Sequence, residues 1–170
     1  MPFTPVHMGP GILLKSLLQG SFSLMVFGWT QIIMDLQPLY VMVSNSTRFE
    51  LHGFSHTYLG ATLLAVLSAL SGKYLAEIGL KLLEFSTRAQ PIKIGWRIAF
   101  FSACLGSYSH VALDSIMHAD LQPYYPFAVG NPLLDIIDMT QLHEFCFYTG
   151  LAGGVIYSLV QIIRDLKKTP

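Results

Sequence analysis

The stretch that decides the fold is SHVALDSIMHADLQPYYPF, residues 109–127. It gathers His110, Asp114, His118 and Asp120, although only 12% of the 170 residues are charged. The first three recur every four positions, so on a helix that turns about 100° per residue they would form one stripe. A single histidine is more often a hydrogen-bonded interior residue. Three polar groups in register, with a carboxylate in the middle, favour a metal site instead, because ionisable groups near membrane depth are costly unless paired or coordinated.

The rest of the chain is apolar enough to indicate a membrane protein. Hydrophobic residues make up 52% of it, and the mean hydropathy is +0.51. A span needs about 20 apolar residues in a helix, and the stretches that lack charge for about that long are 16–34, 51–72, 98–113 and 145–163. We therefore expect residues 1–170 to form a single membrane-embedded domain. Its fold would be an all-α bundle of about four spanning helices, preceded by a short helix over 8–19 that turns at residues 19–21.

The basic residues predict which way the chain is threaded. One side of the expected membrane would carry Lys15, Lys73, Lys81, Arg88, Lys93, Arg97, Arg164, Lys167 and Lys168, and the other side only Arg48. Cytoplasmic segments carry the excess of Lys and Arg. We therefore expect a multi-pass protein of the cell membrane with a cytoplasmic C-terminus and with the loops 36–50 and 115–144 outside. The formal net charge of zero argues against a nucleic-acid partner, which would require a basic excess.

This threading brings the polar groups to the outer face. Asp35 would close the first span, where Pro38 is expected to stop the helix. In HGFSHT, residues 52–57, His56 is the favoured ligand, while His52 supports the site or contacts substrate, and Ser55 or Thr57 caps the next helix. The candidate metal ligands are His7, Asp35, His56, His110, Asp114, His118 and His143, with His52 and Asp120 as possible additions.

The last span is expected to begin after Asn131-Pro132, with Asn131 as its N-cap. His143 and Glu144 would then lie near its start. Adjacent helical residues point about 100° apart, so these two cannot easily bind the same ion. Between the third and fourth spans, the loop QPYYPF at 122–127 is rich in aromatic residues. It reads either as an interfacial anchor or as the lip of a substrate site, and the two readings are compatible.

In these motifs the chain resembles a bacterial family of membrane-bound metal-dependent hydrolases, the YdjM-like or LexA-regulated inner-membrane group. The resemblance rests on His7, Asp35, HGFSHT and SHVALD…LQPYYPF and covers most of the chain. The order of ligands is also similar to that of the zinc-dependent phospholipase C and single-strand nuclease superfamily. That likeness implies one ion held by Asp35, His56, His110 and Asp114, and a second held by His118, His143 and Glu144. His7 with a bridging Asp114 would suggest a third.

The leading hypothesis is therefore a hydrolase that uses two to three zinc or similar divalent ions. Its substrate would be a phosphoester, either a small molecule or a phospholipid-like compound, at the outer membrane face, and Asp35 or Glu144 would orient the attacking water. The alternative is a membrane protein without hydrolase activity that binds haem or handles metal. Carboxylates among the histidines disfavour haem, and spans without ionisable residues at mid-depth disfavour a transporter. The sequence leaves the oligomeric state open.

Overall fold

The structure is a computed structural model, which describes residues 5–44, 51–83 and 92–167. In the described part every regular element is helical, which confirms the all-α prediction. The elements in chain order are η1 (Pro5–His7), α1 (Met8–Leu18), η2 (Gln19–Ser21), α2 (Leu24–Ser44), η3 (Phe54–His56), α3 (Tyr58–Leu82), α4 (Trp96–Met117) and α5 (Met139–Leu166).

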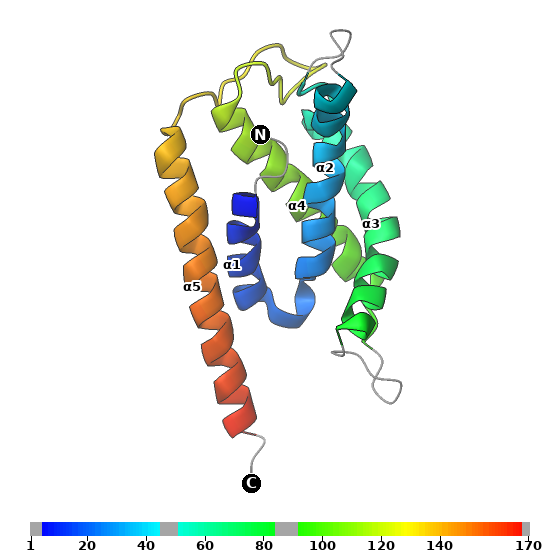
Figure 1. Cartoon of the computed structure of the whole chain (residues 1–170), viewed down its shortest axis with the longest axis vertical. Coiled ribbons are helices and arrows are strands. Elements are labelled where there is room, and N and C mark those ends of the chain that lie inside the picture. The colour runs from blue at the N-terminus through cyan, green and yellow to red at the C-terminus, as the bar shows by residue number, and fades with distance from the viewer. Residues whose placement is uncertain (1–4, 45–50, 84–91, 168–170) are drawn as a thin grey trace.

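The helices form an elongated bundle in which α2, α3 and α4 pack together and α1 lies against α5 (Figure 1). The short α1 runs in one direction, the chain reverses at η2, and α2 returns beside it. This agrees with the predicted short helix and turn. At Gln19 the backbone enters the left-handed region with φ 49°, and Phe22 is extended with φ −136°. Lys15 Nζ holds the turn by donating to the carbonyl oxygens of Gln19 and Phe22, at 2.7 and 2.9 Å. The charge-free stretch 16–34 is therefore divided between two helices and is not one span.

The expected end of α2 is wrong. The helix runs through Pro38 to Ser44. A proline removes one backbone hydrogen bond and crowds the preceding turn. Here Asp35, Pro38 and Val41 are all buried against neighbouring segments, and tertiary packing supplies most of a helix's stability. Packing on both sides of Pro38 therefore sustains the helix across the lost bond.

The expected start of the last helix is also wrong. The helix α5 begins at Met139, with Asp138 as its N-cap, where Asp138 Oδ2 accepts from the backbone N–H of Thr140 at 2.7 Å. The side chain of Asn131 instead caps the C-terminal end of α4. Its Nδ2 donates to the carbonyl oxygens of Ser115 and His118, at 2.6 and 3.1 Å, and so satisfies carbonyls that the end of α4 leaves free.

The face of α3 that packs inside the bundle is built from small residues and its outer face from large ones. On α3 the buried positions are Gly60, Ala61, Ala65, Ser68, Ala69, Gly72 and Ala76. Leucines of the same helix, such as Leu63 and Leu67, are 59% and 52% exposed. Small residues at helix contacts with large apolar ones outside are typical of helices that face lipid.

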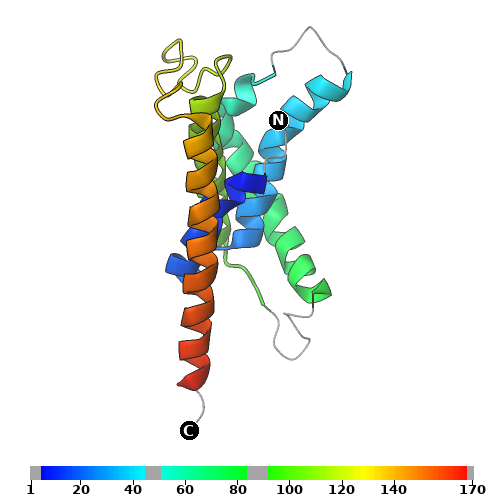
Figure 2. The same ribbon diagram turned by 60° about the vertical axis from the view of Figure 1, so that its left-hand side comes forward.

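Two of the described helices, α3 and α5, are long and apolar enough to cross a membrane. Only 11% of the apolar window of α5 is buried within the chain, so this helix offers most of its apolar surface to its surroundings (Figure 2). Of the other two expected spans, 98–113 lies within α4 and remains a prediction, as does the orientation of the chain, whereas 16–34 is divided between two helices. Arg48, Arg88 and Lys168 lie outside the described residues.

The directions of the helices bring the polar loops to one end. The C-terminal end of α4 and the N-terminal ends of α3 and α5 lie together, and the segment 118–138 covers them (Figure 1). The C-terminal ends of α3 and α5 and the N-terminal end of α4 lie at the opposite end of the bundle. The described basic residues Lys81, Arg97 and Arg164 belong to these opposite ends, which agrees with their expected separation from the polar groups.

Candidate metal centre

Three segments that are distant in sequence bring four ligand-type side chains together. Asp35 comes from α2, His56 from η3, and His110 and Asp114 from successive turns of α4. Each offers one ligand atom, and all four atoms lie within 4.8 Å of one another. All four residues are buried. We call this set the primary cluster.

The separations inside the primary cluster match a coordination sphere. His110 Nε2 lies 3.4 Å from Asp35 Oδ1 and 3.1 Å from Asp114 Oδ2, and His56 Nε2 lies 3.4 Å from Asp114 Oδ2. With metal–ligand bonds of about 2.0–2.1 Å, two ligands of a tetrahedral ion lie about 3.4 Å apart. Nitrogen and oxygen atoms in a direct hydrogen bond are usually about 2.9 Å apart. The two separations of 3.4 Å are longer than a direct hydrogen bond and fit ligands that share a cation, whereas the 3.1 Å between His110 Nε2 and Asp114 Oδ2 suits either arrangement.

The hydrogen bonds of Gln31 fix the tautomer of His110. The Gln31 Nε2 group donates to the Gly106 carbonyl at 3.0 Å, which leaves its Oε1 as an acceptor for His110 Nδ1 at 2.7 Å. His110 must therefore carry a proton on Nδ1, so a neutral ring directs the lone pair of Nε2 at Asp35 and Asp114. A lone pair that faces two carboxylates is repulsive. Either a second proton or a metal ion must lie between them.

Three buried nitrogen atoms around Asp114 lack a hydrogen-bond partner among the described residues: Nε2 of His7, of His56 and of His110. Buried polar atoms are satisfied in the great majority of cases, and exceptions call for an explanation such as an ion. In His56, as in His110, the other ring nitrogen is occupied, because Nδ1 lies 2.9 Å from Ser55 Oγ. Metal-binding histidines commonly use one nitrogen for the ion and the other for an orienting hydrogen bond. The residues present therefore fit a divalent metal.

The loop that carries His56 is held on both sides. The backbone N–H of Ser55 donates to Gln37 Oε1 at 3.3 Å, and a side chain at Gly53 would collide with the Gln37 amide. Thr57 is the N-cap of α3, which is one of the two caps expected from the sequence. Its Oγ1 accepts a hydrogen bond from the Gly60 N–H at 2.9 Å. These contacts fix His56 against α2 before α3 begins.

His118 does not continue the helical stripe. The helix α4 ends at Met117, and His118 is its extended C-cap, with φ −117° and ψ 115°, so the expectation of one stripe through all three positions is wrong. The side chain nevertheless stays near Asp114. Ligand-type atoms of His52, Asp114 and His118 lie within 4.8 Å of one another, and we call this set the secondary cluster.

The other predicted site residues fall at different distances from these clusters. His7 is close, with Nε2 3.5 Å from Asp114 Oδ1, and burial lowers its pKa to about 4, which keeps the ring neutral at pH 7. Asp120 accepts from His52. Burial raises the pKa of Asp120, but the hydrogen bond from His52 outweighs it and holds that pKa below its usual value. Neither His143 nor Glu144 belongs to either cluster of the described residues, and Glu144 is exposed.

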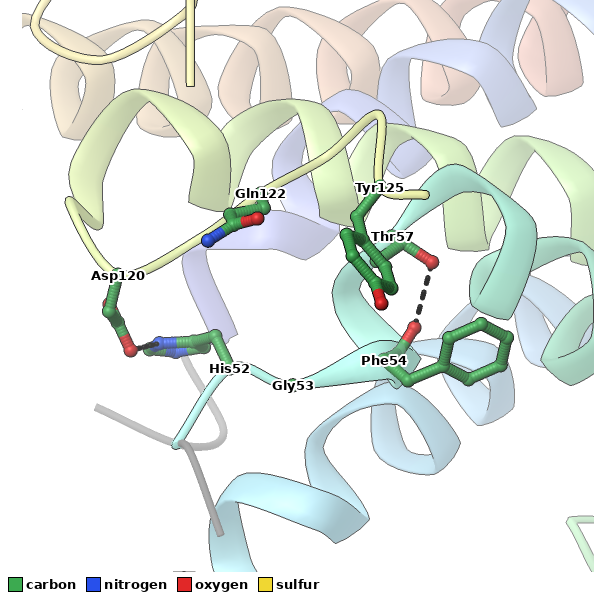
Figure 3. Close-up of a pocket in the computed structure, with 7 residues that line it drawn as sticks. All are labelled: His52, Gly53, Phe54, Thr57, Asp120, Gln122 and Tyr125. Atoms are coloured by element: carbon green, nitrogen blue, oxygen red, sulfur yellow. Dashed lines mark hydrogen bonds and ion pairs between the residues drawn. The ribbon is translucent and has the colours of Figure 1, made fainter. Parts of the chain in front are cut away.

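A pocket of about 300 Å³ opens beside the secondary cluster. Figure 3 shows His52 and Asp120 at one side of it, with Gln122 and Tyr125 above and the Gly53-Phe54 backbone below. The aromatic loop 122–127 thus forms a wall of the pocket, which favours its reading as a lip. Across Tyr125 lies a more apolar groove, which includes Tyr58, Tyr108 and Phe127.

Sequence reasoning missed Gln31 and Gln37. Gln31 lies one helical turn before Asp35, and Gln37 lies two residues after it. A glutamine in a charge-free apolar stretch is costly to bury without a partner, so its presence there was a usable signal. It was passed over because glutamine is not itself a usual metal ligand.

Comparison of the chain with protein-family models, with curated proteins and with solved structures finds no match. The resemblance to the membrane-bound hydrolases therefore rests on the sequence motifs alone. The class that fold and site define is an all-helical protein with two candidate membrane spans and a buried His/Asp cluster able to hold a metal ion.

Proposed function

We propose that the protein is a membrane-bound, metal-dependent hydrolase of phosphoesters, with zinc or a similar divalent ion in the primary cluster. The observation that carries the proposal is the set of buried, unpartnered Nε2 atoms that surround Asp114. A set of histidines and carboxylates without cysteine is usual in catalytic rather than structural zinc sites. Asp35, His56, His110 and Asp114 would hold the ion.

A divalent ion in such a site lowers the pKa of a water molecule and neutralises charge on phosphoryl oxygens. The protein's own groups would prepare that chemistry. Gln31 and Ser55 fix the rings of His110 and His56, so the donor atoms need no rearrangement when an ion binds. Asp35, which lies beside His110 Nε2, is placed to accept a proton from the attacking water. Glu144 is a weaker candidate for that role because it is exposed and outside both clusters.

The substrate we favour is a lipid-like phosphoester at the outer membrane face. The polar pocket beside His52 offers space for a phosphate headgroup, and the neighbouring groove, with Tyr58, Tyr108 and Phe127, offers an apolar wall for a chain. Both openings lie at the end of the bundle away from Lys81, Arg97 and Arg164. If the basic end is cytoplasmic, the substrate would reach the site from outside.

Haem is disfavoured as the bound group. Two axial histidines would need a flat space between their rings, but a carboxylate oxygen of Asp114 lies within 3.4 Å of His56 Nε2 and 3.1 Å of His110 Nε2. A negatively charged oxygen in that position suits a small divalent cation.

The test replaces Asp114 with Asn, which keeps the size of the side chain and removes its charge. Detergent-purified, zinc-loaded protein is assayed on bis(p-nitrophenyl) phosphate and on phospholipid in mixed micelles. We expect Asp114→Asn to lose both bound zinc and at least about 100-fold in kcat/KM, or about 2.7 kcal/mol of transition-state stabilisation. Asp165→Asn, at the far end of α5, is the matched control and should keep both. Zinc-loaded native protein that hydrolyses neither substrate, or an Asp114→Asn protein with full zinc content and activity, would refute the proposal.

A further inference from the structure

The secondary cluster shares Asp114 with the primary one but is built from different histidines. His52 comes from the segment before η3, and His118 from the end of α4. The resemblance to the phospholipase C superfamily implies a second ion held by His118, His143 and Glu144. In the structure His143 and Glu144 lie outside the set that includes His118.

His52 is prepared as a ligand in the same manner as His110. Its Nδ1 lies 2.9 Å from Asp120 Oδ2, and a carboxylate accepts but does not donate at neutral pH. The proton of the His52 ring is therefore on Nδ1, and a neutral ring presents a lone pair on Nε2. A carboxylate behind a histidine is the usual support of a metal-binding imidazole, because it orients the ring and makes the free nitrogen more basic.

His118 lies face to face with His52. The ring centroids are 4.2 Å apart and the ring planes differ by 28°. Two imidazolium cations stacked at this distance would repel one another, whereas two neutral rings stack without that cost. Asn131 fixes the backbone at His118 by donating to its carbonyl oxygen. The His118 ring is therefore held both by its fixed backbone and by stacking on His52.

We propose that His52, His118 and the shared carboxylate of Asp114 form a second divalent-cation site, in which Asp120 acts as a positioning residue for His52. The site rests on the primary metal centre of the proposed function, because Asp114 serves both, but not on hydrolytic activity. His52 lines the pocket of about 300 Å³ and His56 does not. The second ion is thus the one that borders the space available to a substrate.

The experiment counts ions rather than turnover. Chelator-treated, detergent-purified protein is titrated with Mn²⁺ alone. Free and bound Mn²⁺ are distinguished by their electron paramagnetic resonance spectra. We expect two equivalents in the native protein, with a spin-coupled signal from two ions joined by one carboxylate. The double variant His52→Gln/His118→Gln should bind one equivalent without the coupled signal. His143→Gln is the matched control and should bind two.

A second variant keeps the proposal testable if the double variant fails to fold. The side chain of Asp120 is 46% exposed, so Asp120→Asn should fold normally. We expect it to weaken the second Mn²⁺ about 10- to 100-fold and to leave the first unchanged. Two equivalents in a folded double variant, an unaltered second affinity in Asp120→Asn, or fewer than two equivalents in the native protein would overturn the second site. Two bound ions without phosphoester hydrolysis would instead support this site and count against the proposed function.

Discussion

Gln31 offers the sharpest test of the primary cluster, because it would affect a bound ion only through His110. Replacing Gln31 with Leu keeps nearly the same volume in a buried position. It removes the acceptor of the His110 Nδ1 proton, 2.7 Å away, and the donor to the Gly106 carbonyl, 3.0 Å away. His110 is then free to change tautomer or rotate.

The expected size of the effect follows from these two lost contacts. Loss of an orienting partner behind a metal-binding histidine typically costs 10- to 100-fold in metal affinity, which is about 1.4–2.7 kcal/mol. Buried polar groups left without a partner would lower the free energy of unfolding by a further amount of about 1–3 kcal/mol each. The metal-free protein should therefore be less stable as well, whereas a purely catalytic role for Gln31 would leave its stability unchanged.

The assay is a competition titration of zinc against a chromophoric chelator in detergent. Gln161→Leu, far along α5 from the cluster, is the matched control and should bind zinc as the native protein does. Gln31→Glu tests the acceptor role alone, because a carboxylate accepts from Nδ1 but cannot donate to the Gly106 carbonyl; it should restore most of the zinc affinity but not the stability of the metal-free protein. A folded Gln31→Leu protein with native zinc affinity would refute the assignment of the His110 tautomer, and with it the argument that a proton or a metal ion must lie between His110 and the carboxylates.

Two further predictions concern the packing and the threading of the chain. Gly153→Ala should lower the midpoint of thermal unfolding in detergent, because the new Cβ would lie 2.5 Å from the backbone nitrogen of Leu13, and such overpacking costs about 1–3 kcal/mol. Gly154→Ala, where the new Cβ meets nothing within 4 Å, should leave the midpoint unchanged or raise it; equal losses in both would contradict the close packing of α1 on α5. For the threading, a single cysteine placed in the loop 119–142 of a Cys104/Cys146-free protein should react with an impermeant reagent in intact cells, and one placed near Lys167 should not. The reverse pattern would place the candidate site in the cytoplasm.

The parts of the fold that were predictable are those that local sequence signals control. The short helix ending near Leu18, the turn at residues 19–21 and the capping role of Thr57 follow from the residues at those positions. The closeness of His110 to Asp114 follows from a spacing of four along one helix. The involvement of Asp35 and His56 was predicted from the expected threading, which brings the polar groups to one membrane face, and from the resemblance of the motifs, because no local rule brings α2 and η3 together.

The parts that were not predictable depend on contacts between distant segments. Pro38 carries a strong local signal for a helix end, but burial against the neighbouring segments overrides it. Asn131 reads as an N-cap for the helix that follows, yet its side chain caps the helix that precedes it. His118 leaves the helical stripe because α4 ends one residue earlier, where Asn131 bonds the His118 carbonyl oxygen. For Asn131 the tertiary contact competes with a capping preference of only about 1 kcal/mol, and at Pro38 with a helix-breaking preference of about 3 kcal/mol.

The origin of the primary cluster in three separate segments also sets an order for its assembly. A nascent chain that has reached only α2 holds Asp35 alone, and one that has reached α3 adds His56. The remaining two ligands arrive together on α4, so no tight site exists until α4 has packed, and the last helix contributes nothing to this cluster. An ion that binds only the packed state stabilises it by about 4 kcal/mol when its concentration is 1,000 times its dissociation constant. Metal loading would then need only the packing of α2, η3 and α4, and it would lock these three segments in place without waiting for the last helix.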